Sequence, residues 1–387
     1  MNAKPVTQRR YDLDWLRVCA VLGVFFFHSL HFFDPGDWSV KNLTTYPWVG
    51  WLMGVLGLWL MPLIFVVSGA SVFYASRKGN ATGFLKDKVL RLFIPLLVGA
   101  FTFSTTQVYV ERVSHGQFQG TFFQFLPHYF DGLYFEGGTG NFAFHGMHLW
   151  YLLVLFVFTL LLMPLFWWLK GTVGGNVLRR LGDVLALPGA LILLIVPTVI
   201  LQNITDCDAL GGDFKLGGWR LVQYLWFFLA GYLIVSHARL QQRIIQARGV
   251  CLGLSLMLVA LSIARLVNLD RVSDIAVWPV LLAMLGFAMK YLTFSNRFLA
   301  YTNEAALPFY ILHQTVLLGV AFFVVGWAVP DLSKYLIIML TSFVTCVLLY
   351  EHLVRRVNAL RFLFGLKPLR RSVQPTPAVT PVLQTTK

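Results

Sequence analysis

An arginine and a histidine lie eleven residues apart in the first apolar segment of the chain, residues 15–33. Eleven residues make almost three turns of an α-helix, so Arg17 and His28 are expected on one helix face, about 16 Å apart along the axis. Ionisable residues inside a membrane usually face the protein interior and mark a pathway or an active site. We therefore predict a site that runs from Arg17, near one membrane surface, towards His28, nearer the other.

Each of these residues could also have a purely structural role. A buried histidine often only bonds neighbouring helices, and Arg17 could anchor the helix end beside Asp14, one turn back. The chemical interpretation is that His28 takes a proton from a hydroxyl, because an imidazole changes protonation near neutral pH. Arg17 would bind an anionic group, for which its planar guanidinium suits phosphate.

More basic residues precede the third apolar segment, in the sequence FLKDKVLRLFIP. Lys88 and Arg91 lie near the expected level of Arg17. They could dock a phosphate-rich cofactor, or they could simply mark the cytoplasmic side of the membrane.

Polar residues also begin two later segments. His148 and Trp150 begin the fourth at the outer surface, where they could shape a pocket or anchor the helix at the interface. His313 lies about two turns into the ninth, and Glu304 just before it, where it could cap the helix. The histidine spacing matches no strong metal motif, and we expect no metal.

The composition identifies the class of protein. The 387 residues are 57% hydrophobic and only 12% charged, with a mean hydropathy of +0.69, whereas a soluble chain carries about 25% charged residues. The class is therefore an all-α, polytopic membrane protein. The net charge of +14 needs no nucleic acid, because basic residues orient membrane proteins and attract anionic lipid.

Ten apolar runs are long enough to predict membrane-spanning helices. They are residues 15–33, 48–75, 88–110, 147–169, 187–203, 218–236, 249–268, 275–292, 305–327 and 333–353. If both ends are cytoplasmic, all but seven of the 31 Lys and Arg residues fall inside, as the positive-inside rule requires. The seven are Lys41, Arg112, Lys215, Arg220, Arg265, Arg271 and Lys334.

The expected organisation is a cytoplasmic N-terminus (1–14), a membrane domain (15–368) and a disordered cytoplasmic tail (369–387). The first span should be uncleaved. The outer segment 111–146 is rich in phenylalanine and glycine and is too broken for a span. It could cap an outward cavity or form an aromatic belt at the membrane interface. Three of the four cysteines lie in apolar segments and Cys207 in a loop, so no disulfide framework is expected.

Six elements, in order from about residue 10 to residue 368, resemble those of the integral-membrane acyltransferase family 3. They are RRYDLDWLRVCAVLGVFFFH, MPLIFVVSGASVF, KVLRLFIP, HLWYLLVL, LPFYILHQ and LLYEHLVRRVNALRFLFGLKP. The first and last are most similar to a branch of the family that succinylates glucans.

The resemblance implies a ten-helix core that moves an acetyl or succinyl group from cytoplasmic acyl-CoA to a carbohydrate hydroxyl outside. Arg17 and His28 match the family's arginine and histidine on the first helix. Lys88 and Arg91 stand where the family has an Arg-x-x-Arg pair, so a bidentate phosphate contact is lost at Lys88. The remaining family positions are matched by Ser68, Gly69, Trp150 and Glu304.

The sequence thus predicts an O-acyltransferase of the bacterial inner membrane, with acyl-CoA, a glycan acceptor and membrane lipid as partners. His28 would act as the base or be transiently acylated itself. The coenzyme would be held by Arg17, Ser68, Lys88 and Arg91, and the acceptor by His148, Trp150, Glu304 and His313. The alternatives are a transporter or flippase for an acylated or anionic substrate, and a sensor or assembly protein that keeps the fold without catalysis.

Overall fold

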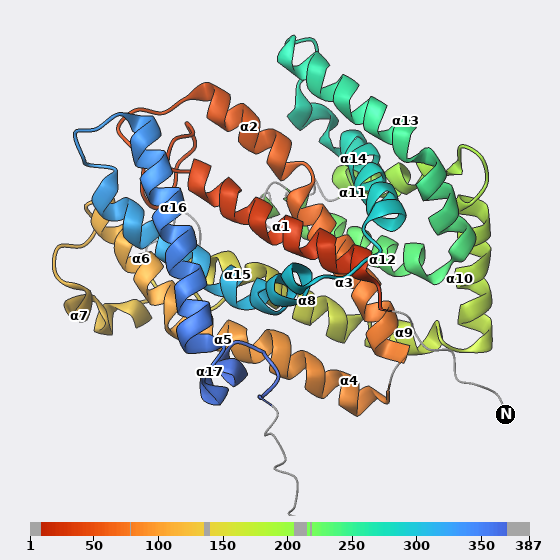
Figure 1. Cartoon of the computed structure of the whole chain (residues 1–387), viewed down its shortest axis with the longest axis horizontal. Helices are drawn as coiled ribbons and strands as arrows, with labels where there is room; N and C mark the ends of the chain where they lie inside the picture. Colours follow the sequence, from red (N-terminus) through yellow and green to blue (C-terminus); the bar gives the residue numbers. More distant parts are fainter. Residues whose placement is uncertain (1–8, 78, 135–139, 205–214, 217–218, 370–387) are drawn as a thin grey trace, which may run out of the picture.

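The chain is built almost entirely from helices that run side by side (Figure 1). The computed structural model describes residues 9–77, 79–134, 140–204, 215–216 and 219–369. Cys207 and most of the predicted tail lie outside the described residues. The first half of the described chain contains α1 (Tyr11–Leu30), α2 (Pro47–Gly57), α3 (Leu60–Arg77), α4 (Ala81–Lys88), η1 (Val89–Phe93), α5 (Ile94–Phe101), α6 (Phe103–Ser114), α7 (Phe122–Phe125), η2 (Pro127–Phe130), η3 (Met147–Leu149), α8 (Trp150–Leu161), α9 (Met163–Trp168) and α10 (Thr172–Leu185).

The second half continues with helices and one short pair of strands. Its elements are η4 (Ala190–Leu194), α11 (Ile195–Ile204), β1 (Lys215–Leu216), β2 (Trp219–Arg220), α12 (Leu221–Ser236), α13 (Ala238–Ile263), α14 (Leu269–Tyr291), α15 (Arg297–Val324), α16 (Asp331–Leu349), η6 (Tyr350–Val354) and α17 (Asn358–Leu363). The strands β1 and β2 are antiparallel and pair Lys215 with Arg220.

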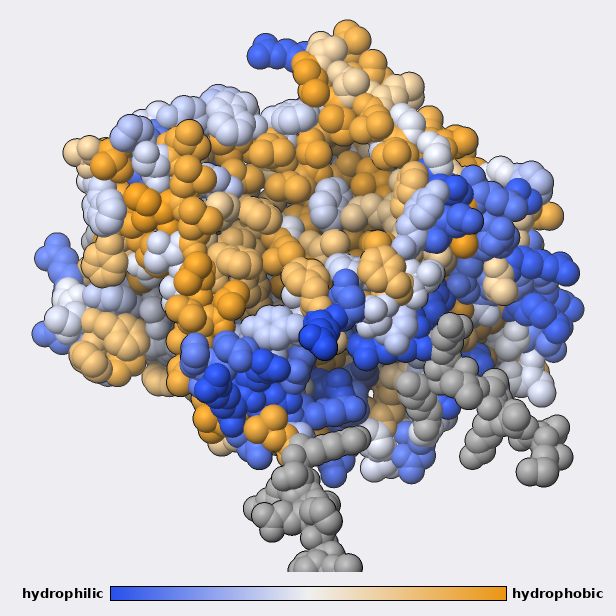
Figure 2. Space-filling view, in the orientation of Figure 1, coloured by the Kyte–Doolittle hydropathy of each residue, from blue (hydrophilic) through white to orange (hydrophobic). Residues whose placement is uncertain are grey.

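Seven helical segments among the described residues are long and apolar enough to cross a membrane. They coincide with seven of the ten predicted spans. Three shorter apolar helices, Met147–Leu161, Ala190–Gln202 and Leu221–Ser236, lie where the other three were expected. Figure 2 shows hydrophobic residues over much of the visible surface, with hydrophilic residues gathered towards the lower and right edges, near α4, α17 and α10. The class predicted from composition, an all-α multi-pass membrane protein, is confirmed.

The central helices approach one another closely. α1 packs against α3 and α15, and α3 packs against α12. A Cβ atom added to Gly69 on α3 would lie 1.8 Å from the carbonyl oxygen of Phe228, and one added to Gly231 on α12 would lie 1.9 Å from that of Val66. Only glycine lets the two backbones approach this closely, as at other helix crossings in membranes. Gly69 of the Ser-Gly element is therefore a helix-packing residue.

The third apolar segment changes helix type at its basic end. α4 is followed by the π-helical turn η1, which contains Arg91, and then by α5, which has Pro95 in its first turn. In a regular α-helix the N–H of residue 95 would donate to the carbonyl oxygen of residue 91. Because proline has no N–H, this hydrogen bond cannot form, and the helix departs from the regular α form just before Pro95. Such π-helical turns are frequent at functional sites.

The start and the end of the described chain meet at one end of the bundle. Arg9 and Lys367 line the same cavity, together with Arg91. The C-terminal segment is also attached through Arg361, whose Nη2 donates to Glu304 Oε1 at 2.6 Å. The two ends of the described chain therefore lie at the same end of the bundle.

The starts predicted for the seventh and ninth spans are too late, since α13 begins at Ala238 and α15 at Arg297. Glu304 was expected just before the ninth helix as its cap, but α15 begins at Arg297 and contains Glu304. The N-cap is Asn296, whose side chain accepts the N–H of Leu299. Pro308 lies inside α15 and does not end it. Membrane helices tolerate such a proline where neighbouring groups satisfy the freed backbone.

No helix long enough to cross a membrane lies within the described part of segment 111–146, which the sequence predicts to be an outer segment. Its described part folds into short helical turns around a small core cluster of Val108, Phe125, Tyr129, Tyr134 and Ala143. The segment is attached to the loop after α1, since Ser39 Oγ donates to Glu111 Oε2 at 3.0 Å. Several of its aromatic side chains, such as Phe123 and Phe130, remain exposed.

Candidate active site

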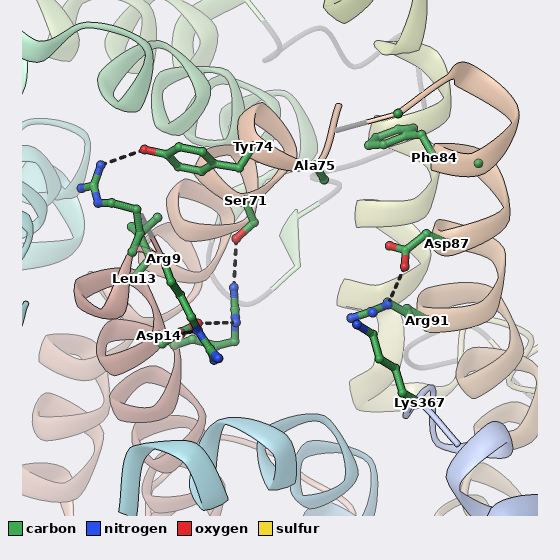
Figure 3. Close-up of a pocket in the computed structure, with 14 residues that line it drawn as sticks. Arg9, Leu13, Asp14, Ser71, Tyr74, Ala75, Phe84, Asp87, Arg91 and Lys367 are labelled. Atoms are coloured by element: carbon green, nitrogen blue, oxygen red, sulfur yellow. Dashed lines mark hydrogen bonds and ion pairs between the residues drawn. The ribbon is translucent and has the colours of Figure 1, made fainter. Parts of the chain in front are cut away.

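A cavity of about 570 Å³ lies at the end of the bundle where both described termini meet, and we call it the basic cavity. Figure 3 shows Arg91 and Lys367 together on one wall, facing Arg9, Asp14 and Ser71 across the space. Among the residues that the structure describes, five basic ones line it against two acidic ones. The described residues that line it are Arg9, Arg10, Leu13, Asp14, Arg17, Ser71, Tyr74, Ala75, Gly79, Gly83, Phe84, Asp87, Arg91 and Lys367. A site of this size and charge can hold an anionic small molecule.

Arg17 is held in place on one wall of the basic cavity. Its Nη1 donates to Asp14 Oδ1 at 3.3 Å and to Asn303 Oδ1 at 3.1 Å, and its Nη2 donates to Ser71 Oγ at 2.9 Å. These partners come from α1, α15 and α3, the helices that pack around Arg17. The guanidinium is thereby fixed while about a third of the side chain, 36%, remains exposed. Such pre-organisation favours the binding of an anion.

The two basic residues of the third segment lie differently. Arg91 lines the basic cavity and pairs with Asp87 on α4, with Nε 2.7 Å from Oδ1. Lys88 is half-buried, and its Nζ lies 5.2 Å from the centre of the Phe84 ring. Phe84 lines the cavity, and Lys88 contacts this wall without being among the described residues that line it.

Three histidines meet about three turns further along α1. His28 Nδ1 is 2.8 Å from His313 Nε2. His313 Nδ1 is 2.6 Å from the carbonyl oxygen of Tyr310, and His148 Nε2 is 3.0 Å from the same oxygen. The His148 ring also stands edge-on to that of His313, with 5.0 Å between centroids. We call these three residues the histidine cluster. α1, α15 and the turn before α8 supply one each.

The hydrogen bonds determine which ring nitrogen carries each proton. A carbonyl oxygen only accepts, so His313 Nδ1 must donate to Tyr310 and His313 Nε2 must accept. His28 Nδ1 is then the donor to His313, which leaves the lone pair of the neutral His28 ring on Nε2. His148 donates through Nε2 to Tyr310, and its Nδ1 accepts from Gln107 Nε2 at 3.2 Å. His28 is thus oriented as a base by a second histidine, as catalytic histidines are oriented by their partners.

Polar groups connect the basic cavity with the histidine cluster. Ser68, one turn before Ser71 on α3, shares a hydrogen bond of 2.5 Å with the hydroxyl of Tyr151. The Tyr151 ring lies 6.0 Å from that of Tyr310, whose hydroxyl donates to the carbonyl oxygen of His148. Ser68 therefore lies between the two ends of the site, and Ser71 is the serine that contacts Arg17.

Two of the four residues predicted to bind the acceptor, Trp150 and Glu304, are not brought to the histidine cluster. Trp150 packs between helices, with its ring 5.5 Å from Tyr224 and 6.3 Å from Phe65. Glu304 follows Asn303, the partner of Arg17, and lies nine residues before His313, about 13.5 Å along α15. It therefore lies at the Arg17 end of the site.

The sequence did not single out several polar residues of the site. Asn303 and Ser71 orient Arg17, and Gln107, Tyr151 and Tyr310 surround the histidines. Only the spacing of Ser71 three residues after Ser68 could have suggested a second polar contact on the same face of α3. Among the described residues, no three His, Cys, Asp or Glu side chains form a group that could hold a metal ion.

Comparison with known proteins identifies the family. A family model described as Acyltransferase domain matches residues 10–351, nearly the whole chain. Two proteins named glucans biosynthesis protein C, from Salmonella agona and Salmonella paratyphi A, are each 24% identical to it over 388 residues, which is 93% of this chain and 95% of theirs. No solved structure matches. The chain therefore belongs to acyltransferase family 3 and is a multi-pass membrane acyltransferase that transfers groups other than aminoacyl groups.

Proposed function

We propose that the protein transfers an acyl group, acetyl or succinyl, from cytoplasmic acyl-CoA to a hydroxyl of a glucan or other glycan outside the bacterial inner membrane. One observation carries this proposal: α1 bears Arg17 on the wall of the basic cavity and His28 in the histidine cluster, eleven residues apart. An anion-binding end and a proton-accepting end on one helix suit a donor and an acceptor that approach from opposite sides. The names of the relatives support a glucan as the acceptor.

The basic cavity would hold the nucleotide end of coenzyme A. Arg17 and Arg91 would contact its phosphates, and Lys88, which contacts the wall at Phe84, would add positive potential. The thin pantetheine arm would then extend past Ser68 and Tyr151 towards His28. Glu304 would keep the C-terminal segment on the cavity through Arg361, and Trp150 would support the helix that carries Tyr151.

At the other end, His28 would act as the general base. His28 Nε2 takes the proton of the acceptor hydroxyl while the oxygen attacks the thioester carbonyl carbon. The carbon–sulfur bond breaks, and the same nitrogen returns the proton to the leaving thiolate. The bond from His28 Nδ1 to His313 becomes charge-assisted while His28 is protonated, which stabilises that state. The alternative mechanism is covalent: His28 Nε2 is itself acylated transiently and then passes the acyl group to the acceptor hydroxyl.

We further propose that all ten apolar segments cross the membrane, with both ends in the cytoplasm. The shared position of Arg9 and Lys367 supports an even count, and seven long helices alone would give an odd one. The three shorter apolar helices supply the remaining crossings. The distribution of Lys and Arg along the sequence supports the cytoplasmic position of the ends.

The test uses purified protein in lipid nanodiscs, with acetyl-CoA or succinyl-CoA and a glucan oligosaccharide. Transfer is followed by mass spectrometry of the oligosaccharide and by release of free coenzyme A. His28→Ala should abolish both signals, whereas His128→Ala, on the exposed outer segment, should leave them unchanged. Transfer by folded His28→Ala protein at the normal rate would reject the proposal. Uptake of substrate into vesicles without an acyl donor would favour a transporter.

A further inference from the structure

A second histidine of the first segment lies just beyond α1 and is not used in the reaction proposed above. His31 Nδ1 is 2.7 Å from Asp34 Oδ1. Lys41 Nζ donates to the same carboxylate oxygen at 2.7 Å, and the backbone N–H of Gly36 donates to Asp34 Oδ2 at 3.0 Å. Lys41 also donates to the carbonyl oxygens of His31 and Asp34, each at 2.6 Å. This tight turn fixes the carboxylate against the His31 ring.

The turn also determines what His31 can bind. Burial opposes ionisation of Asp34, but hydrogen bonds from His31 and Lys41 outweigh it and lower the pKa of Asp34 to about 2. The carboxylate therefore accepts the Nδ1–H of His31, and the lone pair of the neutral ring lies on Nε2. This nitrogen makes no hydrogen bond with any residue that the structure describes, and the side chain is 22% exposed.

One tryptophan places His31 beside His28. The ring of Trp38 stacks on that of His31, with 4.6 Å between centroids and 12° between planes, and on that of His28 at 6.0 Å and 19°. The ring of Phe27 meets both imidazoles edge-on, at 5.6 and 5.8 Å. Residues three apart on a helix have Cβ atoms about 5–6 Å apart, a separation that one sugar ring can bridge. The backbone of Trp38 is held by a further contact, because His115 Nε2 lies 3.2 Å from the backbone carbonyl oxygen of Trp38.

We infer that His31 and Trp38 form the binding site for the acceptor sugar. Nε2 of His31 accepts a hydrogen bond from one sugar hydroxyl while another hydroxyl of the same sugar reaches Nε2 of His28. The ring of Trp38, which stacks on both imidazoles, holds them in place for these two contacts. The site therefore selects acceptors with at least two hydroxyls on one ring over simple alcohols. This inference rests on the proposed function and assigns its acceptor side.

The first test separates binding of the acceptor from binding of the donor. His31→Ala and Asp34→Asn should each raise KM for a glucan oligosaccharide about tenfold, because one hydrogen bond to the sugar is lost or misaligned. KM for acyl-CoA should stay within twofold, since the basic cavity lies at the other end of α1. The matched control is His128→Ala, because His128 forms the same kind of pair three residues before Asp131, at 2.9 Å, on the exposed outer segment. An unchanged acceptor KM in folded His31→Ala protein would overturn the inference.

A second test needs no variant. Diethylpyrocarbonate modifies unprotonated imidazole nitrogens, and mass spectrometry of peptides locates the modified histidines. A glucan oligosaccharide should protect His31 in the unaltered protein several-fold and leave His128 reactive, whereas ethanol at the same hydroxyl concentration should protect neither. Equal labelling of His31 with and without the oligosaccharide would refute the inference. If His28→Ala abolishes transfer in that case, the proposed function stands and only the acceptor site is wrong.

Discussion

Replacement of His313 by phenylalanine tests how His28 is activated. His313 is 1% exposed and accepts the Nδ1–H of His28 at 2.8 Å. Phenylalanine keeps an aromatic ring at this position but removes the acceptor. A hydrogen bond to a charged group contributes about 1.5–3 kcal/mol, and His28 carries its charge only while it holds the proton of the acceptor. Since about 1.4 kcal/mol is a factor of ten in rate, kcat should fall about 10- to 150-fold.

The assay is the initial steady-state rate of acyl transfer at saturating acyl-CoA and glucan, with KM for each substrate measured separately. KM for acyl-CoA should not change, because Arg17 lies about 16 Å away along α1. His313→Gln should lose less activity, since its amide oxygen can accept in place of Nε2. The control is Gln314→Met on the same helix, because Gln314 Oε1 has no hydrogen-bond partner among the described residues. A kcat within threefold of normal in folded His313→Phe protein would refute the reasoning.

Three further predictions concern the cavity, the helix crossing and the loop after α1. Arg17→Ala should raise KM for acyl-CoA at least tenfold. Arg17→Lys should raise it less, because lysine keeps the charge but lacks the planar guanidinium that binds phosphate through two hydrogen bonds. Equal effects of the two variants on KM would argue against phosphate binding. Gly69→Ala should lower the free energy of unfolding by about 1–3 kcal/mol, because the added Cβ would overlap the Phe228 carbonyl. Gly253→Ala is the control and should leave it unchanged, because a Cβ added there meets no atom within 4 Å. Thermal melting measures the stability of both variants. The ionised Asp34, whose pKa is lowered in the folded protein, stabilises the fold above about pH 4, and this stabilisation is lost as the pH falls towards 2. Between pH 4.5 and 2.5, the melting temperature of Asp34→Asn should therefore drop less than that of the unaltered protein. Equal drops in the two proteins would contradict this reasoning.

The main features of the fold follow from short-range patterns in the sequence. Twenty-residue apolar runs predict spans, and the helical period places Arg17 and His28 on one face of the first helix. The start of a predicted helix is harder to locate, because the charge of Glu304 suggested a boundary that α15 passes through. Neighbouring helices stabilise that part of α15, and the local sequence does not reveal them.

The candidate site could be predicted only where a residue is unusual for its surroundings. A histidine inside an apolar segment is conspicuous, so His28, His148 and His313 were all singled out. Asn303 and Tyr151 are ordinary polar residues in ordinary helices, and their roles arise from packing between segments far apart in the chain. The basic residues Arg9 and Lys367 were interpreted as signals of orientation, and only the fold shows that they share one cavity.

The walls of the basic cavity also have a consequence for biosynthesis. Arg9 precedes α1, the first helix, whereas Lys367 follows α17, the last helix that the structure describes. A chain still emerging from the ribosome has its first helix in place but lacks the last wall of this cavity. The basic cavity is thus completed only after Lys367 has been made, and chains that terminate before this residue lack a complete one.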